Sequence, residues 1–121
     1  MNMPILKPIS NNLYEVVELY SWTLDSGDIV RVPAGYKTNG ADIPRFFWRI
    51  YPPNSPEYMP AVVIHDYLCD IADEMTDKAG RKQAFLFADD VFREILLKIG
   101  VSKIKTSLFY RAVRLHHILK G

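Results

Sequence analysis

A histidine and an aspartate lie where two expected helices should face the protein core. His65 falls inside the apolar stripe of a helix expected over about residues 60–71, formed by Ala61, Ile64, Leu68 and Ala72. Asp89 falls inside the stripe of a helix expected over residues 78–100, formed by Phe85, Ala88, Phe92, Ile95, Leu96 and Ile99. Residues three and four apart share one helix face, so both polar side chains should point inward. An imidazole beside a carboxylate in such a place could move protons.

Burial of Asp89 requires a partner. Burying an unpaired carboxylate costs several kcal/mol, so a hydrogen-bond donor should lie next to it. Counted outward from the connection at residues 73–77, His65 and Asp89 lie within about one helical turn of the same level, at roughly 1.5 Å of rise per residue. We therefore predict a hydrogen bond between the two side chains across a pair of antiparallel helices.

The predicted pair has two interpretations. An imidazole held through one nitrogen by a carboxylate presents the other nitrogen as a base, which can take a proton from water or a hydroxyl. In that case His65 and Asp89 are catalytic. Alternatively, the two side chains are a structural polar pair that joins two helices. The residues alone leave both interpretations open.

A loop before the helices carries oxygen ligands suited to a hard cation. Asn39, Gly40 and Asp42 offer side-chain oxygens and backbone carbonyls that the glycine frees, and calcium takes six to eight oxygen ligands. Asp66 points about 100° away from its neighbour His65 on the helix and could reach this loop. These four residues, Asp66 included, are the predicted calcium site. The alternative is that Asn39 and Gly40 form a turn and that Asp42 caps the segment after it.

We expect these residues to be positioned by an α+β fold in a single domain. In chain order we expect an N-terminal arm (residues 1–12), a β-hairpin (13–33), a shaped loop (34–59) and three helices (60–119). Within the hairpin, alternating apolar residues predict one strand over residues 13–24, and Pro33 ends the second strand. Ser102 is the expected N-cap of the last helix, which runs to Leu119.

The composition excludes several classes of protein. The chain is 49% hydrophobic and 24% charged, with a formal net charge of +1. These values argue against disorder and give no strong signal for nucleic-acid binding. No apolar run is long enough for a transmembrane segment, and the first residues lack the pattern of a signal peptide, so we expect a protein of the cytoplasm.

Cysteine and histidine usage predicts no further chemical site. Cys69 is the single cysteine, so it cannot form an internal disulfide and lacks the companions of a cysteine-based zinc site. We expect it to be a small buried hydrophobe rather than a nucleophile. His116 and His117 are adjacent on the last expected helix and cannot both face one metal ion, so we predict no metal site there.

A basic C-terminal segment and an aromatic run are candidate binding surfaces. Six lysine or arginine residues and no acid occur from residue 98 onward. Among them, Arg111, Arg114 and Lys120 could meet the phosphates of a lipid or a nucleotide, or they could complement the dipole of the last helix. Trp48 lies in an aromatic run that is either a lid over the core or an exposed anchor for lipid or protein.

Four blocks of the sequence, in this order, resemble a family of small phage and prophage proteins of unknown function. The blocks are residues 32–45 (VPAGYKTNGADIPR), 61–68 (AVVIHDYL), 88–92 (ADDVF) and 110–117 (YRAVRLHH). The resemblance runs from about residue 29 to residue 117. It implies a phage or prophage accessory protein made in the host cytoplasm, either free there or incorporated in the virion.

The order of the HD pair and the later aspartate also resembles the core of secretory and bacterial phospholipases of the A-two type. This likeness implies a phospholipase-like helix pair and a calcium-dependent lipid ester hydrolase. Carried over to this chain, His65 is the base that activates water and Asp89 orients it. Asp66 and the loop from Asn39 to Asp42 then hold the calcium ion.

Two functions therefore stand side by side. The first is a calcium-assisted ester hydrolase that acts on lipid or on another component of the cell envelope. The second is a non-catalytic phage protein, either a virion or tail component or an inhibitor of a host defence, which binds a protein or a nucleotide. A homo-oligomer is compatible with either function.

Overall fold

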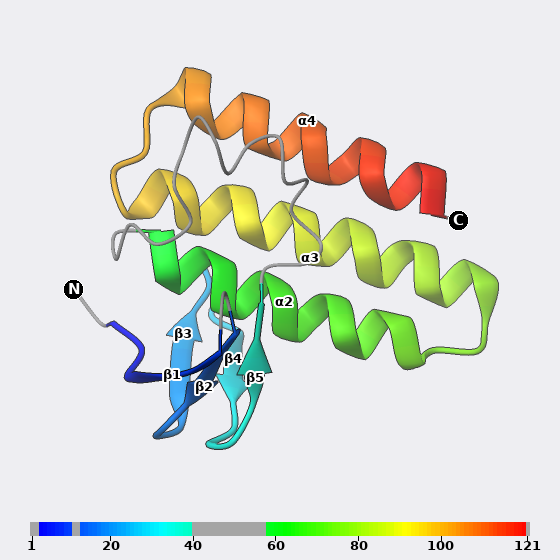
Figure 1. Cartoon of the computed structure of the whole chain (residues 1–121). Coiled ribbons are helices and arrows are strands. Elements are labelled where there is room, and N and C mark those ends of the chain that lie inside the picture. The colour runs from blue at the N-terminus through cyan, green and yellow to red at the C-terminus, as the bar shows by residue number, and fades with distance from the viewer. Residues whose placement is uncertain (1–2, 11–12, 40–57, 121) are drawn as a thin grey trace.

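The computed structural model describes residues 3–10, 13–39 and 58–120 (Figure 1). Antiparallel strands occupy the N-terminal part and three helices follow, so the predicted α+β class is confirmed. Three of the predicted site residues, Gly40, Asp42 and Trp48, lie outside the described residues. Most of the loop predicted over residues 34–59 lies outside them as well.

Within the described residues, five strands form two small antiparallel sheets. The first has the order β1-β2-β5 and joins β1 (Leu6–Ser10), β2 (Leu13–Val16) and β5 (Lys37–Thr38). The second pairs β3 (Tyr20–Thr23) with β4 (Ile29–Val32). The turn between β3 and β4 contains Gly27, whose φ of 95° is a conformation that glycine adopts without strain. This second sheet is a hairpin inside the range where one was predicted.

The prediction of one strand over residues 13–24 is wrong. The chain leaves the first sheet after Val16 and enters the second sheet at Tyr20. Glu18 explains the break, because it has the parity of the buried residues, and a charged side chain cannot be buried there without a partner. The arm predicted over residues 1–12 also contains a strand, since β1 pairs with β2.

Three helices carry the predicted chemistry. They are α2 (Met59–Glu74), α3 (Lys78–Lys98) and α4 (Lys103–Lys120). α3 lies between α2 and α4, and neighbouring helices run antiparallel (Figure 1). The predicted cap at Ser102 is present, since its Oγ accepts a hydrogen bond from the Lys105 N–H at 3.2 Å. None of these described helices combines the length and apolar character needed to cross a bilayer.

α2 lies at the centre of the packing. It contacts α3 on one side and β4 and β5 on another. Its Ile64 belongs to one core cluster with Phe92 of α3 and Val32 of β4. Because α2 is enclosed in this way, the polar residues His65 and Asp66 are buried with it.

Candidate functional site

His65 and Asp89 are in contact, as their helical positions predict. His65 Nε2 lies 2.7 Å from Asp89 Oδ1, across the interface between α2 and α3. Neither side chain is exposed to solvent. The buried carboxylate therefore has the donor that its burial requires. The predicted contact is present, while the catalytic role of the pair stays a prediction.

A second histidine, which the sequence analysis missed, also contacts Asp89. His117 of α4 places Nδ1 2.7 Å from Asp89 Oδ2 and is itself buried. The signal for it is in the sequence, because the buried residues of α4 follow a helical spacing of three and four: Thr106, Phe109, Val113 and His117. Adjacent residues point about 100° apart on a helix, so His116 and His117 face different directions. When the two histidines are considered only as a pair, the buried position of His117 is overlooked.

Two imidazoles and a guanidinium surround the Asp89 carboxylate. Arg114 Nη1 lies 2.9 Å from Oδ2, in addition to the contacts with the two histidines. Burial alone raises the pKa of Asp89, but the hydrogen bonds from His117 and His65 outweigh burial and hold the pKa below its ordinary value. Asp89 is therefore a carboxylate at neutral pH. Arg114, predicted as part of a basic binding surface, turns inward to this carboxylate.

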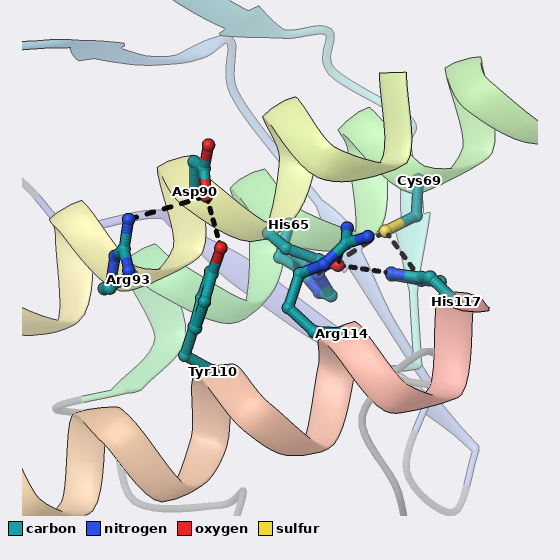
Figure 2. Close-up of polar contacts among 8 residues, drawn as sticks. His65, Cys69, Asp90, Arg93, Tyr110, Arg114 and His117 are labelled. Atoms are coloured by element: carbon teal, nitrogen blue, oxygen red, sulfur yellow. Dashed lines mark hydrogen bonds and ion pairs between the residues drawn. The ribbon is translucent and has the colours of Figure 1, made fainter. Parts of the chain in front are cut away.

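Cys69 lies beside both imidazoles. Its Sγ is 3.5 Å from His65 Nε2 and 3.7 Å from His117 Nε2, and the residue is buried as expected. Figure 2 shows this sulfur on α2 facing the ring of His117 on α4. One ligand atom from each of His65, Cys69, Asp89 and His117 lies within 4.8 Å of the other three. We call these four residues the buried cluster.

The second ring nitrogen of His65 is the unusual atom of the site. Nδ1 is buried and has no hydrogen-bond partner within the part of the chain that the structure describes. The ring packs against Phe92 with centroids 4.6 Å apart, which restricts its orientation. When Nε2 carries the proton that Asp89 accepts, Nδ1 holds a lone pair and can take up a proton.

Asp66 is tied to the strand that leads into the predicted calcium loop. Its Oδ2 accepts a hydrogen bond from the Thr38 hydroxyl and another, at 3.1 Å, from the backbone N–H of Asn39. Two of the predicted calcium ligands, Asp66 and Asn39, are therefore side by side. The contact between them is a hydrogen bond from the Asn39 backbone. Gly40 and Asp42 lie outside the described residues.

Tyr36 connects the start of this loop to α2 through two side-chain contacts. Its hydroxyl donates to Asp70 Oδ2 at 2.6 Å, and its ring meets Tyr67 edge-on with centroids 5.3 Å apart. Burial, together with the nearby carboxylate of Asp70, raises the pKa of Tyr36, so the phenol stays protonated. Tyr36 thus packs against the core, as one alternative for the aromatic residues near this loop predicts. Trp48 lies outside the described residues.

The residues predicted to form a basic surface have different surroundings. Arg111 is exposed on α4, whereas Arg114 contacts Asp89. Lys120 Nζ lies 3.0 Å from Asp73 Oδ1 and joins the end of α4 to the end of α2. These three side chains therefore do not share one environment.

The comparison with protein families matches residues 14–113 to a model described as a protein of unknown function (DUF1353). This range covers most of the chain. The chain belongs to the DUF1353 family. The DUF1353 match contains His65, Cys69 and Asp89, and it ends at Val113, four residues before His117.

A curated relative of this DUF1353 chain is named "Uncharacterized protein y4jT" and comes from Sinorhizobium fredii (strain NBRC 101917 / NGR234). The two are 39% identical over 59 residues, which are 48% of this chain and 18% of the relative. The chain thus spans less than a fifth of that relative's length. No solved structure matches the chain.

Proposed function

We propose that this DUF1353 chain is an ester hydrolase of the phospholipase A-two type, with His65 as its general base. The observation that carries the proposal is the difference between the two nitrogens of His65. Nε2 contacts Asp89, whereas Nδ1 is buried with no partner among the described residues. A general base needs this arrangement, in which one nitrogen is fixed and the other is left basic.

Asp89 sets the tautomer of His65. As a carboxylate it accepts the Nε2–H, which leaves the lone pair on Nδ1. Nδ1 takes a proton from a water molecule while the water oxygen attacks an ester carbonyl. Asp89 stabilises the imidazolium that forms. The imidazolium then gives its proton to the alcohol oxygen as the carbon–oxygen bond breaks, and the products are an acid and an alcohol.

Calcium is the proposed cofactor, held by Asp66 and by oxygens of the loop that begins at Asn39. The buried Asp66 carboxylate follows the base in sequence and is anchored at the start of that loop. Its oxygen chemistry fits a hard cation. When bound there, calcium would neutralise the charge that develops on the carbonyl oxygen during attack. Gly40 and Asp42 are the further proposed ligands.

Lipid is the proposed substrate class because one face of α4 presents exposed apolar side chains. The most exposed of them are Ile104 (76%), Leu115 (58%), Ile118 (64%) and Leu119 (77%). Exposed basic residues accompany them on the same helix: Lys103, Lys105 and Arg111. Such an amphipathic surface is typical of helices that lie on anionic membranes. A phage origin, which the family resemblance implies, belongs to this proposal, and so does action on the host envelope.

Fatty-acid release from anionic phospholipid vesicles tests the proposal. We expect turnover by the wild-type protein that a calcium chelator abolishes. His65→Gln should lower the rate roughly 100-fold or more, because general-base catalysis contributes at least about that much. His116→Gln is the matched control, since His116 lies outside the buried cluster, and it should keep the wild-type rate.

Metal-free wild-type protein that releases no fatty acid when only calcium is added, or a His65→Gln variant that is as fast as wild type, would refute the proposal. Circular dichroism and urea unfolding separate loss of the base from loss of the fold. If His65→Gln does not fold, Asp66→Asn takes over the test because it leaves the buried cluster intact. This variant must then lose its response to calcium.

One observation favours a second candidate function, that of a non-catalytic binding protein. The buried cluster is closed to solvent and joins α2, α3 and α4 through Asp89, as a structural polar network does. In this case the chain is a virion or tail component or an inhibitor of a host defence, and it binds its partner through α4. His65→Gln should then lower the free energy of unfolding while no ester hydrolysis is measured in any variant.

A further inference from the structure

Four potential metal ligands converge from three helices at the buried cluster. His65 and Cys69 lie one turn apart on α2, Asp89 comes from α3 and His117 from α4. All four are buried, and their ligand atoms lie within 4.8 Å of one another. We propose that the buried cluster is a binding site for a divalent transition-metal ion of the zinc class.

The distances to the cysteine sulfur fit tetrahedral coordination. Zinc lies about 2.0–2.1 Å from an imidazole nitrogen and about 2.3 Å from a thiolate sulfur, so a nitrogen and a sulfur on one tetrahedral ion are roughly 3.5 Å apart. Cys69 Sγ lies 3.5 Å from His65 Nε2 and 3.7 Å from His117 Nε2. Binding of a tetrahedral ion by these three atoms therefore requires little change in either sulfur–nitrogen distance.

Asp89 supplies the fourth ligand. Its Oδ1 lies 2.7 Å from His65 Nε2, the separation of two atoms that share a proton. Replacing this proton by the ion moves the two atoms apart by roughly half an ångström. Oδ2 keeps the contacts with His117 Nδ1 and Arg114. A ligating histidine whose other N–H donates to a carboxylate is the usual arrangement around protein-bound metals.

The donor set and its charge select the ion. Thiolate and imidazole ligands favour zinc and similar ions, whereas calcium takes oxygen ligands only. The thiolate of Cys69 and the carboxylate of Asp89 carry two negative charges, which match a divalent cation in a site with no exposed ligand side chain. Binding releases the thiol proton of Cys69, and the Nε2 proton of His65 moves to Nδ1.

One consequence for catalysis rests on the proposed function. With the ion on Nε2, the neutral ring of His65 carries its proton on Nδ1, so this nitrogen cannot act as a base. The zinc-loaded protein should therefore hydrolyse no ester, and removal of zinc should restore hydrolysis. The metal site itself does not depend on the proposed function.

Titration of the metal-free protein with cobalt(II) tests the site, because the spectrum of cobalt reports both its coordination number and thiolate ligation. We expect one equivalent to bind with the intense visible absorption of four-coordinate cobalt and a thiolate-to-cobalt charge-transfer band. Cys69 is the only cysteine of the chain, so this band reports on it alone. Cys69→Ser should abolish the band, and His117→Gln should weaken binding roughly tenfold or more. His116→Gln should bind as wild type does.

A six-coordinate spectrum without the charge-transfer band, or equal cobalt affinity of wild type and Cys69→Ser, overturns the site. The near-isosteric Cys69→Ser carries the test if His117→Gln does not fold. Failure of the two proposals can be told apart. Cobalt binding by a protein whose metal-free form shows no calcium-dependent hydrolysis refutes the proposed function alone, and hydrolysis by the metal-free form without cobalt binding refutes the metal site alone.

Discussion

Asp89 is a fully buried carboxylate whose oxygens accept hydrogen bonds from His65, His117 and Arg114. These donors offset the cost of removing the charge from water. Removing one partner from a buried charged network costs about 3–5 kcal/mol, because a charge is left behind uncompensated. The same hydrogen bonds orient His65, so stability and the proposed chemistry depend on one carboxylate.

Asp89→Asn should lower the free energy of unfolding, and the size of this loss should depend on pH. The pKa of Asp89 in the folded protein lies below its ordinary value of 3.8. Its contribution is therefore fully present above 3.8 and is lost as the pH falls through the folded-state pKa. Urea unfolding of metal-free proteins near neutral pH should show a loss of about 3 kcal/mol. A loss that stays the same when the pH is lowered well below 3.8 contradicts this prediction.

The chemistry of single residues could be predicted where it depends on one helix. Spacing along the helices placed His65 and Asp89 on inward faces, and the cost of a buried charge required them to meet. Arg114 and His117 reach Asp89 only because α4 packs against α3. The spacing along α4 shows which of its faces is apolar. It does not show which side chains of α3 that face contacts. Cys69 was correctly expected to be buried, while its two imidazole neighbours come from tertiary packing.

At the scale of elements, short polar contacts fix how the helices join. The Tyr110 hydroxyl donates to Asp90 at 2.7 Å and links α4 to α3 (Figure 2). The Arg93 guanidinium lies 4.1 Å from the centroid of the Tyr110 ring and adds a cation–π contact. Between α2 and α3, Asp77 accepts a hydrogen bond from the Gly80 N–H at 2.9 Å and starts α3. The short connection before this cap sets the level at which the two helices align.

Asp77→Ala should destabilise the protein by about 1 kcal/mol, because the first turn of α3 loses its side-chain cap. The measurement is the free energy of unfolding in urea. Thr76→Ala is the matched control on the same connection, since Thr76 is exposed, and its effect should stay within about 0.5 kcal/mol. Equal unfolding free energies for the two variants would show that the cap contributes nothing.

Helices could be predicted better than strands because their signals are local. The cap at Ser102 and the connection over residues 73–77 lie within a few residues of the ends that they define. β5 has only two residues and pairs with β2, with Tyr14 opposite Thr38. No alternation can be read from so short a strand, and its partner lies far away in the sequence. Strand pairing of this kind is decided by tertiary contacts.

At the scale of the whole molecule, α4 has two apolar faces. One of them is buried and carries His117 to the buried cluster. The opposite face leaves Ile104 and Leu119 exposed at 76% and 77%. Exposed apolar side chains gathered on one face can mark an interaction surface, and the proposed partner of this surface is an anionic lipid membrane.

The double variant Ile104→Glu, Leu119→Glu should bind anionic phospholipid vesicles roughly tenfold more weakly or worse. Each substitution removes an apolar side chain whose burial is worth about 1.5 kcal/mol or more, and it adds a repelled charge. Vesicle co-sedimentation measures the effect. Leu97→Glu is the control because Leu97 is exposed on α3 rather than on α4. Equal sedimentation of both variants contradicts a lipid-facing role of α4.

The protonation of the His65 ring is the most direct test of the proposed catalytic site. NMR of metal-free protein with isotope-labelled histidine distinguishes a protonated from an unprotonated ring nitrogen, and His65→Gln assigns the His65 signals among the three histidines of the chain. We expect the tautomer that the contact with Asp89 selects, with the proton on Nε2 and the lone pair on Nδ1. A proton on Nδ1 contradicts the proposal, because that nitrogen could then accept none from water.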